Sequence, residues 1–405
     1  MKPLNISRRR FLKGSLAAGA AGLLPNLIFS GSAEAAGSAN NTVIVVHLDG
    51  GWDGLNTVVP FTDPTYAAAR PTLAIAAASV LPINGTLGLH PALTGLKTLY
   101  DQGKVAVVNG AGYPNFNRSH FAAEDIYWTA DPASAPSSGW LGRSLDVINS
   151  GTVMTGIYIG SATPLSMLGD TVLVPAIPSA TSYVFQSGGN VADDAAVLSA
   201  AVQIIDQPAT GLTMIDGILT QDRALRDSIG QVQAAAAAYQ TTVTYANDSF
   251  SGSMKFAAQL IRANIGVRII STDFGSFDTH SGQAARMNTL LGNLSAGIAS
   301  FQQDAQVGGF ANRVAVVFWS EFGRRVAENA SAGTDHGTSA PIVVVGEGVK
   351  GGVIGNYPSL TNLTSGDLLM GVDFRSVYAS VLSDWLAVDD NQVLGANWTK
   401  LPIFL

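Results

Sequence analysis

The sequence contains no cysteine among its 405 residues. This absence excludes disulfide bonds, thiolate ligands for a metal ion and a cysteine nucleophile. Any metal site must therefore be built from histidine and carboxylate side chains. Histidine is also scarce, and the five in the chain are His47, His90, His120, His280 and His336.

Charge is scarce as well. Only 13% of the residues are charged, and the formal net charge is −7. This balance argues against nucleic acid as the main partner, because phosphate backbones are bound by clustered lysine and arginine. With 47% apolar residues the chain can bury a large core. Its length allows one large α/β domain or two or three smaller ones.

The N-terminal segment has the features of an export signal. Residues 7–13, Ser-Arg-Arg-Arg-Phe-Leu-Lys, resemble the twin-arginine motif, and a weakly hydrophobic stretch follows over residues 14–29. Ala33-Glu34-Ala35 then offers a small-x-small cleavage site. We therefore predict a removable twin-arginine signal peptide at residues 1–35, with the export machinery as a partner. An uncleaved membrane anchor is the alternative. Residues 36–405 would form the periplasmic or secreted protein, with no stable membrane span after cleavage.

A mostly β-branched run, Val43-Ile44-Val45-Val46-His47-Leu48, ends in Asp49-Gly50-Gly51. Such a run predicts a strand covered on both faces, as in a parallel sheet. The glycines allow other backbone to approach the Asp49 carboxylate. Because ligands bind beyond the carboxyl ends of such strands, Asp49 is a candidate site residue. The alternative is an aspartate that only caps the following turn.

Predicted strands and helices alternate along most of the remaining chain. This alternation predicts a doubly wound α/β fold with a mainly parallel central sheet. The Ala- and Gln-rich residues 191–241 fall outside the pattern and predict a helical insertion or cap. The further predicted strands are 105–108, 267–272, 314–319 and 341–345, and the predicted helices include 91–102, 253–263, 283–303 and 374–386.

Polar residues cluster where these strands end. Histidine and carboxylate side chains without cysteine suit Zn²⁺, Mn²⁺ or a similar divalent ion. Two such ions would clamp a phosphoryl-type group. For each histidine a hydrogen-bonded structural role is the alternative. The clusters are Asp49, Asp278 with His280, Glu321, and Asp335 with His336.

Ser119 precedes a predicted helix that begins near Phe121. The orphan N–H groups and the dipole at a helix N-terminus favour an anion or an alkoxide, so Ser119 is a candidate nucleophile. Its alternative role is that of a helix N-cap. The adjacent His120 is a candidate ligand or general acid. Arg118 and Arg324 are candidates for binding anionic oxygens, with structural ion pairs as the alternative.

Six motifs in this order resemble the domain-of-unknown-function family 1501. That family is similar to the alkaline phosphatase and sulfatase-like superfamily. The resemblance implies an alkaline phosphatase-like three-layer α/β/α sandwich with a helical insertion. The motifs are the export signal, Leu48-Asp49-Gly50-Gly51, Asn117-Arg118-Ser119-His120-Phe121, Phe277-Asp278-Thr279-His280, Ser320-Glu321-Phe322-Gly323-Arg324 and Asp335-His336-Gly337.

The same resemblance implies roles for individual residues. Ser119 matches the nucleophile, at a helix N-terminus beside a metal ion. The implied metal ligands are Asp49, Asp278, His280, Glu321, Asp335 and His336. Of the remaining histidines, His47 is expected to pack behind the site and His90 to be structural.

Three departures from the superfamily pattern stand out. The spacing Asp278-x-His280 is shorter than the usual Asp-x-x-x-His, and Phe322 stands where a histidine ligand is expected. Asp335-His336-Gly337 itself resembles the Asp-His-Gly motif expected at Glu321, so two positions compete for one role.

The residues and the resemblance together predict an exported metal-dependent hydrolase of phosphate or sulfate esters with a serine nucleophile. Zinc is the first choice of cofactor, with manganese, magnesium or calcium as alternatives, and the substrate would be a small anionic ester or a polymer. The rival hypothesis is a non-catalytic exported surface or matrix protein that retains the fold with a degenerate site. A dinucleotide-binding oxidoreductase is disfavoured, because Gly50-Gly51-x-x-Gly54 has the wrong glycine spacing.

Overall fold

The computed structural model describes residues 38–133, 136–148, 150–184 and 213–405, together with the single residues 200, 203 and 206. The predicted signal peptide lies outside these residues. None of the described helices combines the length and the apolar composition that crossing a membrane requires.

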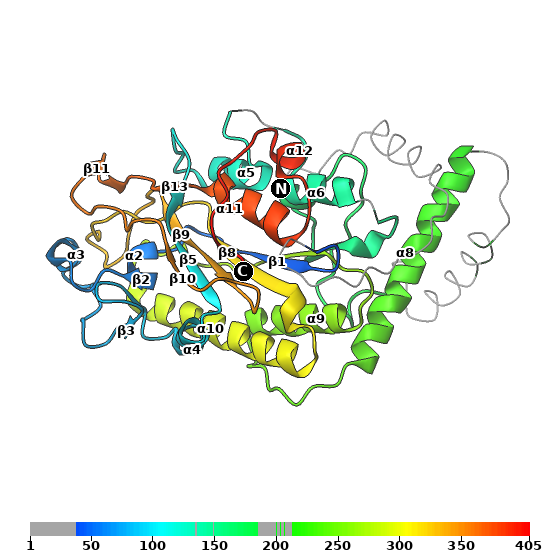
Figure 1. The fold of residues 1–405 in the computed structure, drawn as a ribbon, viewed down its shortest axis with the longest axis horizontal. Helices are drawn as coiled ribbons and strands as arrows, with labels where there is room; N and C mark the ends of the chain where they lie inside the picture. Colours follow the sequence, from blue (N-terminus) through cyan, green and yellow to red (C-terminus); the bar gives the residue numbers. More distant parts are fainter. Residues whose placement is uncertain are drawn as a thin grey trace.

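A central eight-stranded sheet organises the described chain (Figure 1). Its order is β10-β5-β9-β8-β1-β7-β6, with β13 also paired to β5. Every pairing is parallel except those of β9, which runs antiparallel to both β5 and β8. The mainly parallel sheet predicted from the sequence is therefore confirmed. Its strands are β1 (Thr42–His47), β5 (Val105–Gly112), β6 (Gly156–Ile159), β7 (Ile269–Asp273), β8 (Val314–Trp319), β9 (Ala340–Val345), β10 (Gly352–Ile354) and β13 (Val372–Asp373).

Strand β1 lies in the interior of this sheet and is buried along its whole length. Alternate side chains point to opposite faces, as strand geometry requires. Ile44 and Val46 join one hydrophobic core, and Val43 and Val45 join the other. The two cores lie on opposite faces of the sheet, which produces the predicted three-layer arrangement.

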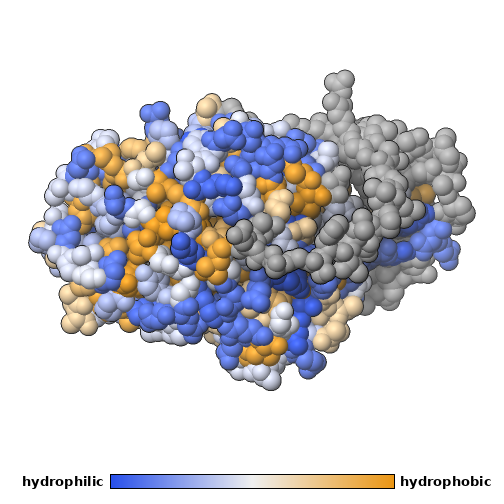
Figure 2. Space-filling model, viewed as in Figure 1, coloured by the Kyte–Doolittle hydropathy of each residue, from blue (hydrophilic) through white to orange (hydrophobic). Residues whose placement is uncertain are grey.

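Helices cover both faces of the sheet (Figure 1). One face packs against α4 (Thr94–Asp101), α9 (Ser249–Arg262) and α10 (Gln283–Val307). The outer surface of α10 is mostly hydrophilic (Figure 2). The other face packs against α5 (His120–Thr129), α6 (Trp140–Ile148), α11 (Phe374–Ser380), the π-helical turn η4 (Val381–Trp385) and α12 (Asp390–Leu394).

Short elements complete the described structure. The predicted helix 374–386 divides into α11 and η4, and the predicted helix 91–102 begins later, at Thr94. The remaining elements are α2 (Gly54–Thr57), α3 (Pro64–Ala69), η1 (Val153–Thr155), η2 (Leu165–Met167), η3 (Ala311–Arg313), the antiparallel strands β2 (Val58–Val59), β3 (Leu81–Pro82) and β4 (Gly88–Leu89), and the pair β11 (Leu363–Thr364) and β12 (Asp367–Leu368).

The predicted insertion at residues 191–241 is described in part. Its helix α8 (Thr213–Ala238) packs against α9 and against η1, the turn that precedes β6. Helix α8 therefore lies near the amino end of β6, whereas the site described below lies at the carboxyl ends of the parallel strands. Most of residues 191–212 lies outside the described part of the chain.

The polar loops lie along one edge of the sheet, namely the edge formed by the ends of the strands and not by an outer strand. The carboxyl ends of β1, β5, β7 and β8 lie together there because these strands run in the same direction. Strand β9 runs the opposite way, so its amino end lies at this edge as well. The loop that precedes β9 consequently joins the loops that follow the other four strands.

Candidate metal centre

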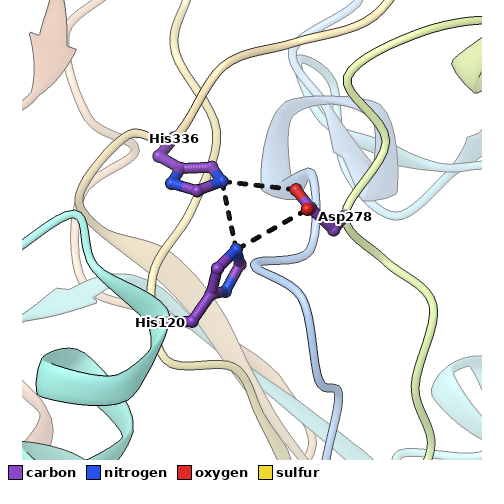
Figure 3. Close-up of side chains that lie close together, drawn as sticks. All are labelled: His120, Asp278 and His336. Atoms are coloured by element: carbon purple, nitrogen blue, oxygen red, sulfur yellow. Dashed lines mark hydrogen bonds and ion pairs between the residues drawn. The ribbon is translucent and has the colours of Figure 1, made fainter.

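Three imidazole rings and one carboxylate converge at this edge. The Nε2 atom of His336 lies 3.1 Å from that of His120 and 2.9 Å from that of His280. Asp278 Oδ1 lies 3.0 Å from His280 Nε2 and 3.3 Å from His336 Nε2. His120 is the first residue of α5, Asp278 and His280 follow β7, and His336 precedes β9. Figure 3 shows the rings of His120 and His336 pointing toward each other and toward Asp278.

The other ring nitrogen of each histidine faces a fixed acceptor. His120 Nδ1 lies 2.6 Å from Glu321 Oε1, and His280 Nδ1 lies 3.2 Å from Asp335 Oδ1. His336 Nδ1 lies 2.8 Å from the backbone oxygen of Arg118. Since a carbonyl or an ionised carboxylate can only accept, each Nδ1 must donate.

In the neutral rings this tautomer leaves the Nε2 lone pairs of His120 and His280 both facing that of His336. Lone pairs about 3 Å apart repel unless protons or a cation lie between them. Histidine ligands of metals characteristically donate the second ring nitrogen to a carboxylate or a carbonyl, which fixes the ring and makes it a better ligand. The donor set and its supports therefore fit a divalent metal ion.

The direction of the pKa shift differs among the candidate ligands. Burial lowers the pKa of His336, which keeps this ring neutral and able to bind a cation. The hydrogen bond to Glu321 raises the pKa of His120, so protons compete more strongly for that ring. Burial acts to raise the pKa of Asp278, but the hydrogen bond and charge of Arg324, together with His280 and His336, outweigh it, and the pKa is lowered.

Glu321 follows β8 and is fully buried. Its Oε1 accepts from Gly50 N at 2.9 Å as well as from His120, and its Oε2 accepts from Ser320 Oγ at 2.9 Å. His47 Nε2 lies 3.1 Å from the same Oε2. Burial alone would raise the pKa of Glu321, but these donors hold it well below its usual range. Glu321, which was predicted as a ligand, accepts a hydrogen bond from His120 and so orients that ring.

A second group of possible ligands surrounds Glu321. One donor atom from each of His47, Asp49, Glu124 and Glu321 lies within 4.8 Å of the others. Burial would lower the pKa of His47, but Asp273 and Glu321 raise it to about 10. A protonated imidazole has no lone pair for a metal, so without an ion His47 is itself the cation of this group. Its ring also stacks on Trp319, with the centroids 4.3 Å apart.

Glu124 was not singled out from the sequence. It lies on α5 four residues after His120, and residues at this spacing share one helix face. Burial raises its pKa to about 7. The helical spacing from His120 was the signal that could have identified it.

Arg324 was predicted to bind substrate, but its side chain is buried and used within the protein. Its Nε donates to Gly51 O at 2.6 Å, and its Nη1 donates to Thr334 O at 2.8 Å. Its Nη2 donates to Asp278 Oδ1 at 2.6 Å and also to Gly50 O. Arg324 therefore joins three loops of the site and holds the carboxylate of Asp278.

Arg118 and Ser119 lie just before α5. The Arg118 guanidinium pairs with the buried Asp367, while its backbone oxygen accepts from His336. Ser119 is exposed and occupies the N-cap position of α5 without a side-chain capping hydrogen bond. Asp49 is likewise exposed, and its backbone oxygen accepts from Phe277 N at 3.0 Å. The structure thus leaves the hydroxyl of Ser119 accessible next to His120.

Two glycines make the close packing possible. A Cβ on Gly50 would lie 2.4 Å from Asp278 N, and one on Gly51 would lie 2.3 Å from Cε2 of Phe322. Both have positive φ, +111° and +70°. The Phe322 ring in turn packs against His120 and His336, with centroid distances of 4.8 Å and 4.7 Å. Phe322, at a position expected for a histidine, therefore forms a wall of the centre.

Behind the centre, the buried Gln283 at the start of α10 ties the loops together. Its Oε1 accepts from Thr279 Oγ1 at 2.9 Å and from Thr334 Oγ1 at 2.6 Å, and its Nε2 donates to Asp53. Thr279 lies between Asp278 and His280. The side-chain amide of Gln283 thus connects three segments: the one that follows β1, the one that follows β7 and the one that precedes β9. The sequence contained no signal for this role.

Comparison with solved structures finds similar folds at low identity. The lipoteichoic acid synthase LtaP from Listeria monocytogenes is 11% identical, with 82% of this chain and 75% of that chain covered and a TM-score of 0.37. The PsFucS1 sulfatase from Pseudoalteromonas sp. is 12% identical, with coverage of 88% and 68% and a TM-score of 0.36. A protein in the alkaline phosphatase superfamily from Vibrio parahaemolyticus is 9% identical, with coverage of 86% and 71% and a TM-score of 0.31. At such identity the similarity concerns the overall fold alone.

No curated protein matches the chain significantly. A model of the twin-arginine translocation signal matches residues 5–25. The predicted export through this pathway, to the periplasm or beyond, is thereby confirmed. The family model described as a protein of unknown function, DUF1501, matches residues 100–396, which is more than half of the sequence, and the chain therefore belongs to that family.

Proposed function

We propose that this protein is an exported metal-dependent hydrolase of phosphate or sulfate esters. In this proposal His120, His280, His336 and Asp278 hold one divalent cation. The observation that carries it is that the Nε2 atoms of His120 and His280 both approach that of His336, while each ring is oriented by an acceptor at Nδ1. Histidines that bind metal ions are characteristically oriented in this way.

Zinc suits this donor set best. Tetrahedral zinc with Zn–N bonds of about 2.0–2.1 Å separates its ligand atoms by roughly 3.3 Å. The contacts between these side chains run from 2.9 Å, for His280 and His336, to 3.7 Å, for His120 and Asp278, so small movements would accommodate the ion. Manganese, with a six-coordinate preference, would leave two positions for other ligands.

The chemistry supplied by a divalent cation is to polarise an ester oxygen and to lower the pKa of a bound water. Ser119 is the proposed nucleophile, exposed at the N-terminus of α5 beside His120. Its Oγ would form a bond to phosphorus or sulfur while the bond to the alcohol oxygen breaks, and the serine proton would pass to solvent as the alcohol takes one up. Water would then hydrolyse the serine ester. The helix N-terminus favours the negative charge that develops at Ser119.

Metal analysis and a substrate screen test the proposal together. Purified mature protein should contain about one divalent ion per chain, and His336→Ala should remove it. The protein should hydrolyse at least one of 4-nitrophenyl phosphate, bis(4-nitrophenyl) phosphate and 4-nitrophenyl sulfate. His90→Gln is the control, because His90 lies outside the four proposed ligands. A metal-loaded protein inactive on all three esters would refute the hydrolase, and turnover unchanged in Ser119→Ala would refute the nucleophile.

The number of proposed protein ligands, which is four, favours a second candidate function. Four protein ligands are typical of closed structural zinc sites, whereas catalytic zinc sites usually have three. The rival is therefore an exported binding or matrix protein in which the ion stabilises the loops. In that case chelation should lower the melting temperature, with no ester turnover in the loaded protein.

A further inference from the structure

An open pocket adjoins the metal centre. Its volume is about 270 Å³, and it lies between residues 113–117 after β5, residues 338–339 before β9, and residues 368–370 at the end of β12. Phe322 belongs to both sites, because it lines this pocket and packs against the rings of His120 and His336. A molecule at the metal centre can therefore extend into the pocket past a single side chain.

The pocket lining contains no charged side chain. Aromatic and aliphatic groups, among them Phe116, Phe322 and Met370, share it with uncharged polar side chains, which are Asn115, Asn117, Thr338, Ser339 and Thr364. A charged group placed there would lose water without gaining an ionic partner, whereas an uncharged group would lose little. The neighbouring cation, Arg118, is already paired with Asp367.

The mouth of the pocket exposes apolar surface. The adjacent lining residues Leu369 and Met370 are 40% and 41% exposed. Exposed apolar surface that borders a cleft is typical of ligand sites. A cavity of about 150 Å³ is large enough for a benzene ring, so this pocket can accept one substituted ring.

We propose that this pocket binds the uncharged, ring-shaped organic part of an ester whose phosphoryl or sulfuryl group lies at the metal centre. The inference rests on the proposed function and defines its substrate class. Aryl or similar neutral ring esters would be preferred to methyl esters and to esters whose alcohol carries a further charge.

Non-hydrolysable phosphonates test this preference without requiring turnover. We would measure the Kd of phenylphosphonate and of methylphosphonate for the zinc-loaded mature protein by calorimetry. Burying the ring should make phenylphosphonate bind about 10- to 100-fold more tightly. Met370→Asp should weaken phenylphosphonate about tenfold or more and leave methylphosphonate unchanged, because a carboxylate at the mouth opposes the apolar ring.

Leu173→Asp is the matched control, since Leu173 is 59% exposed and does not line the pocket. Leu173→Asp should change neither Kd. Melting temperatures of both variants close to that of the wild type would exclude unfolding as the cause of any loss. Equal affinity of the two phosphonates for the wild type would overturn the proposal, as would an equal loss of both in Met370→Asp.

Benzyl alcohol, measured alone by NMR titration, separates this inference from the hydrolase proposal. If neither phosphonate binds the zinc-loaded protein but benzyl alcohol binds, and Met370→Asp abolishes the binding of benzyl alcohol, the pocket's ring preference is supported; if the protein is also inactive on all three nitrophenyl esters, the hydrolase is refuted. If benzyl alcohol and phenylphosphonate both fail to bind, the pocket proposal is refuted.

Discussion

Replacing Glu321 by glutamine tests whether this buried carboxylate prepares His120 for a metal ion. The substitution preserves size and one acceptor oxygen. Gly50 N–H can only donate, so the amide oxygen should face Gly50 and His120, and the NH₂ group should face His47 and Ser320. The NH₂ group then opposes two groups that donate in the wild type.

Two magnitudes follow from this geometry. His120 keeps a neutral acceptor instead of a carboxylate, and losing such a support typically lowers metal affinity about 10- to 100-fold. His47 loses a buried ionic partner, which costs about 3–5 kcal/mol when a buried pair is broken. We expect the lower end, about 3 kcal/mol, because Asp273 Oδ1 still lies 3.6 Å from His47 Nδ1.

Competition with a zinc-chelating dye would give the metal affinity, and urea unfolding would give the stability. Glu347→Gln is the matched control, because Glu347 pairs with Lys104 at 2.6 Å in a partly exposed position. That pair should contribute less than about 1 kcal/mol, and its loss should leave zinc binding unchanged. Wild-type zinc affinity in Glu321→Gln would refute the proposed role of the carboxylate.

Three other predictions concern the supports of the centre. Gln283→Ala should lower the free energy of unfolding by about 3 kcal/mol, because it leaves two threonine hydroxyls and Asp53 with fewer partners; urea unfolding measures this, and an unchanged midpoint would contradict it. Gly51→Ala should displace the Phe322 ring, since the new Cβ would lie 2.3 Å from it, and should weaken zinc binding in the same dye assay. The raised pKa of His47 contributes stability that is complete below pH about 6.5 and is lost as pH rises through about 10. Unfolding free energy measured with urea should therefore fall by about 4 kcal/mol between pH 6 and 9.5, and a His47→Gln variant that shows the same fall would contradict this.

The edge of the sheet that carries the site could be predicted from the sequence. Buried β-branched runs that end in polar residues indicate parallel strands, and their carboxyl ends collect ligands. The direction of β9 could not be predicted, because an apolar run of six residues carries no information on strand polarity. Its reversal nevertheless brings His336 to the same edge as His120 and His280.

The separate roles of the site residues could be assigned only from the structure. The sequence identifies Glu321, Asp335 and Arg324 as polar residues in site loops, but not which atoms they face. Burial decides the outcome for Arg324, whose donors are satisfied by backbone carbonyls and Asp278. For Glu321 and Asp335 the deciding factor is that each meets the Nδ1 side of a histidine. These two contacts join residues 201 and 55 positions apart and leave no local pattern.

The centre is unequally buried, and this determines where a substrate oxygen can enter. The side chains of Asp278 and His280 are each 45% exposed, whereas those of Glu321 and Arg324 are fully buried. Asp278 is also the ligand whose oxygen is shared with a guanidinium, at 2.6 Å from Arg324. A carboxylate that already balances a positive charge binds a second cation less strongly. If the proposed metal ion is bound, Asp278 would therefore be the ligand that yields to an incoming ester oxygen on the solvent side, while the three histidines would remain held by their acceptors.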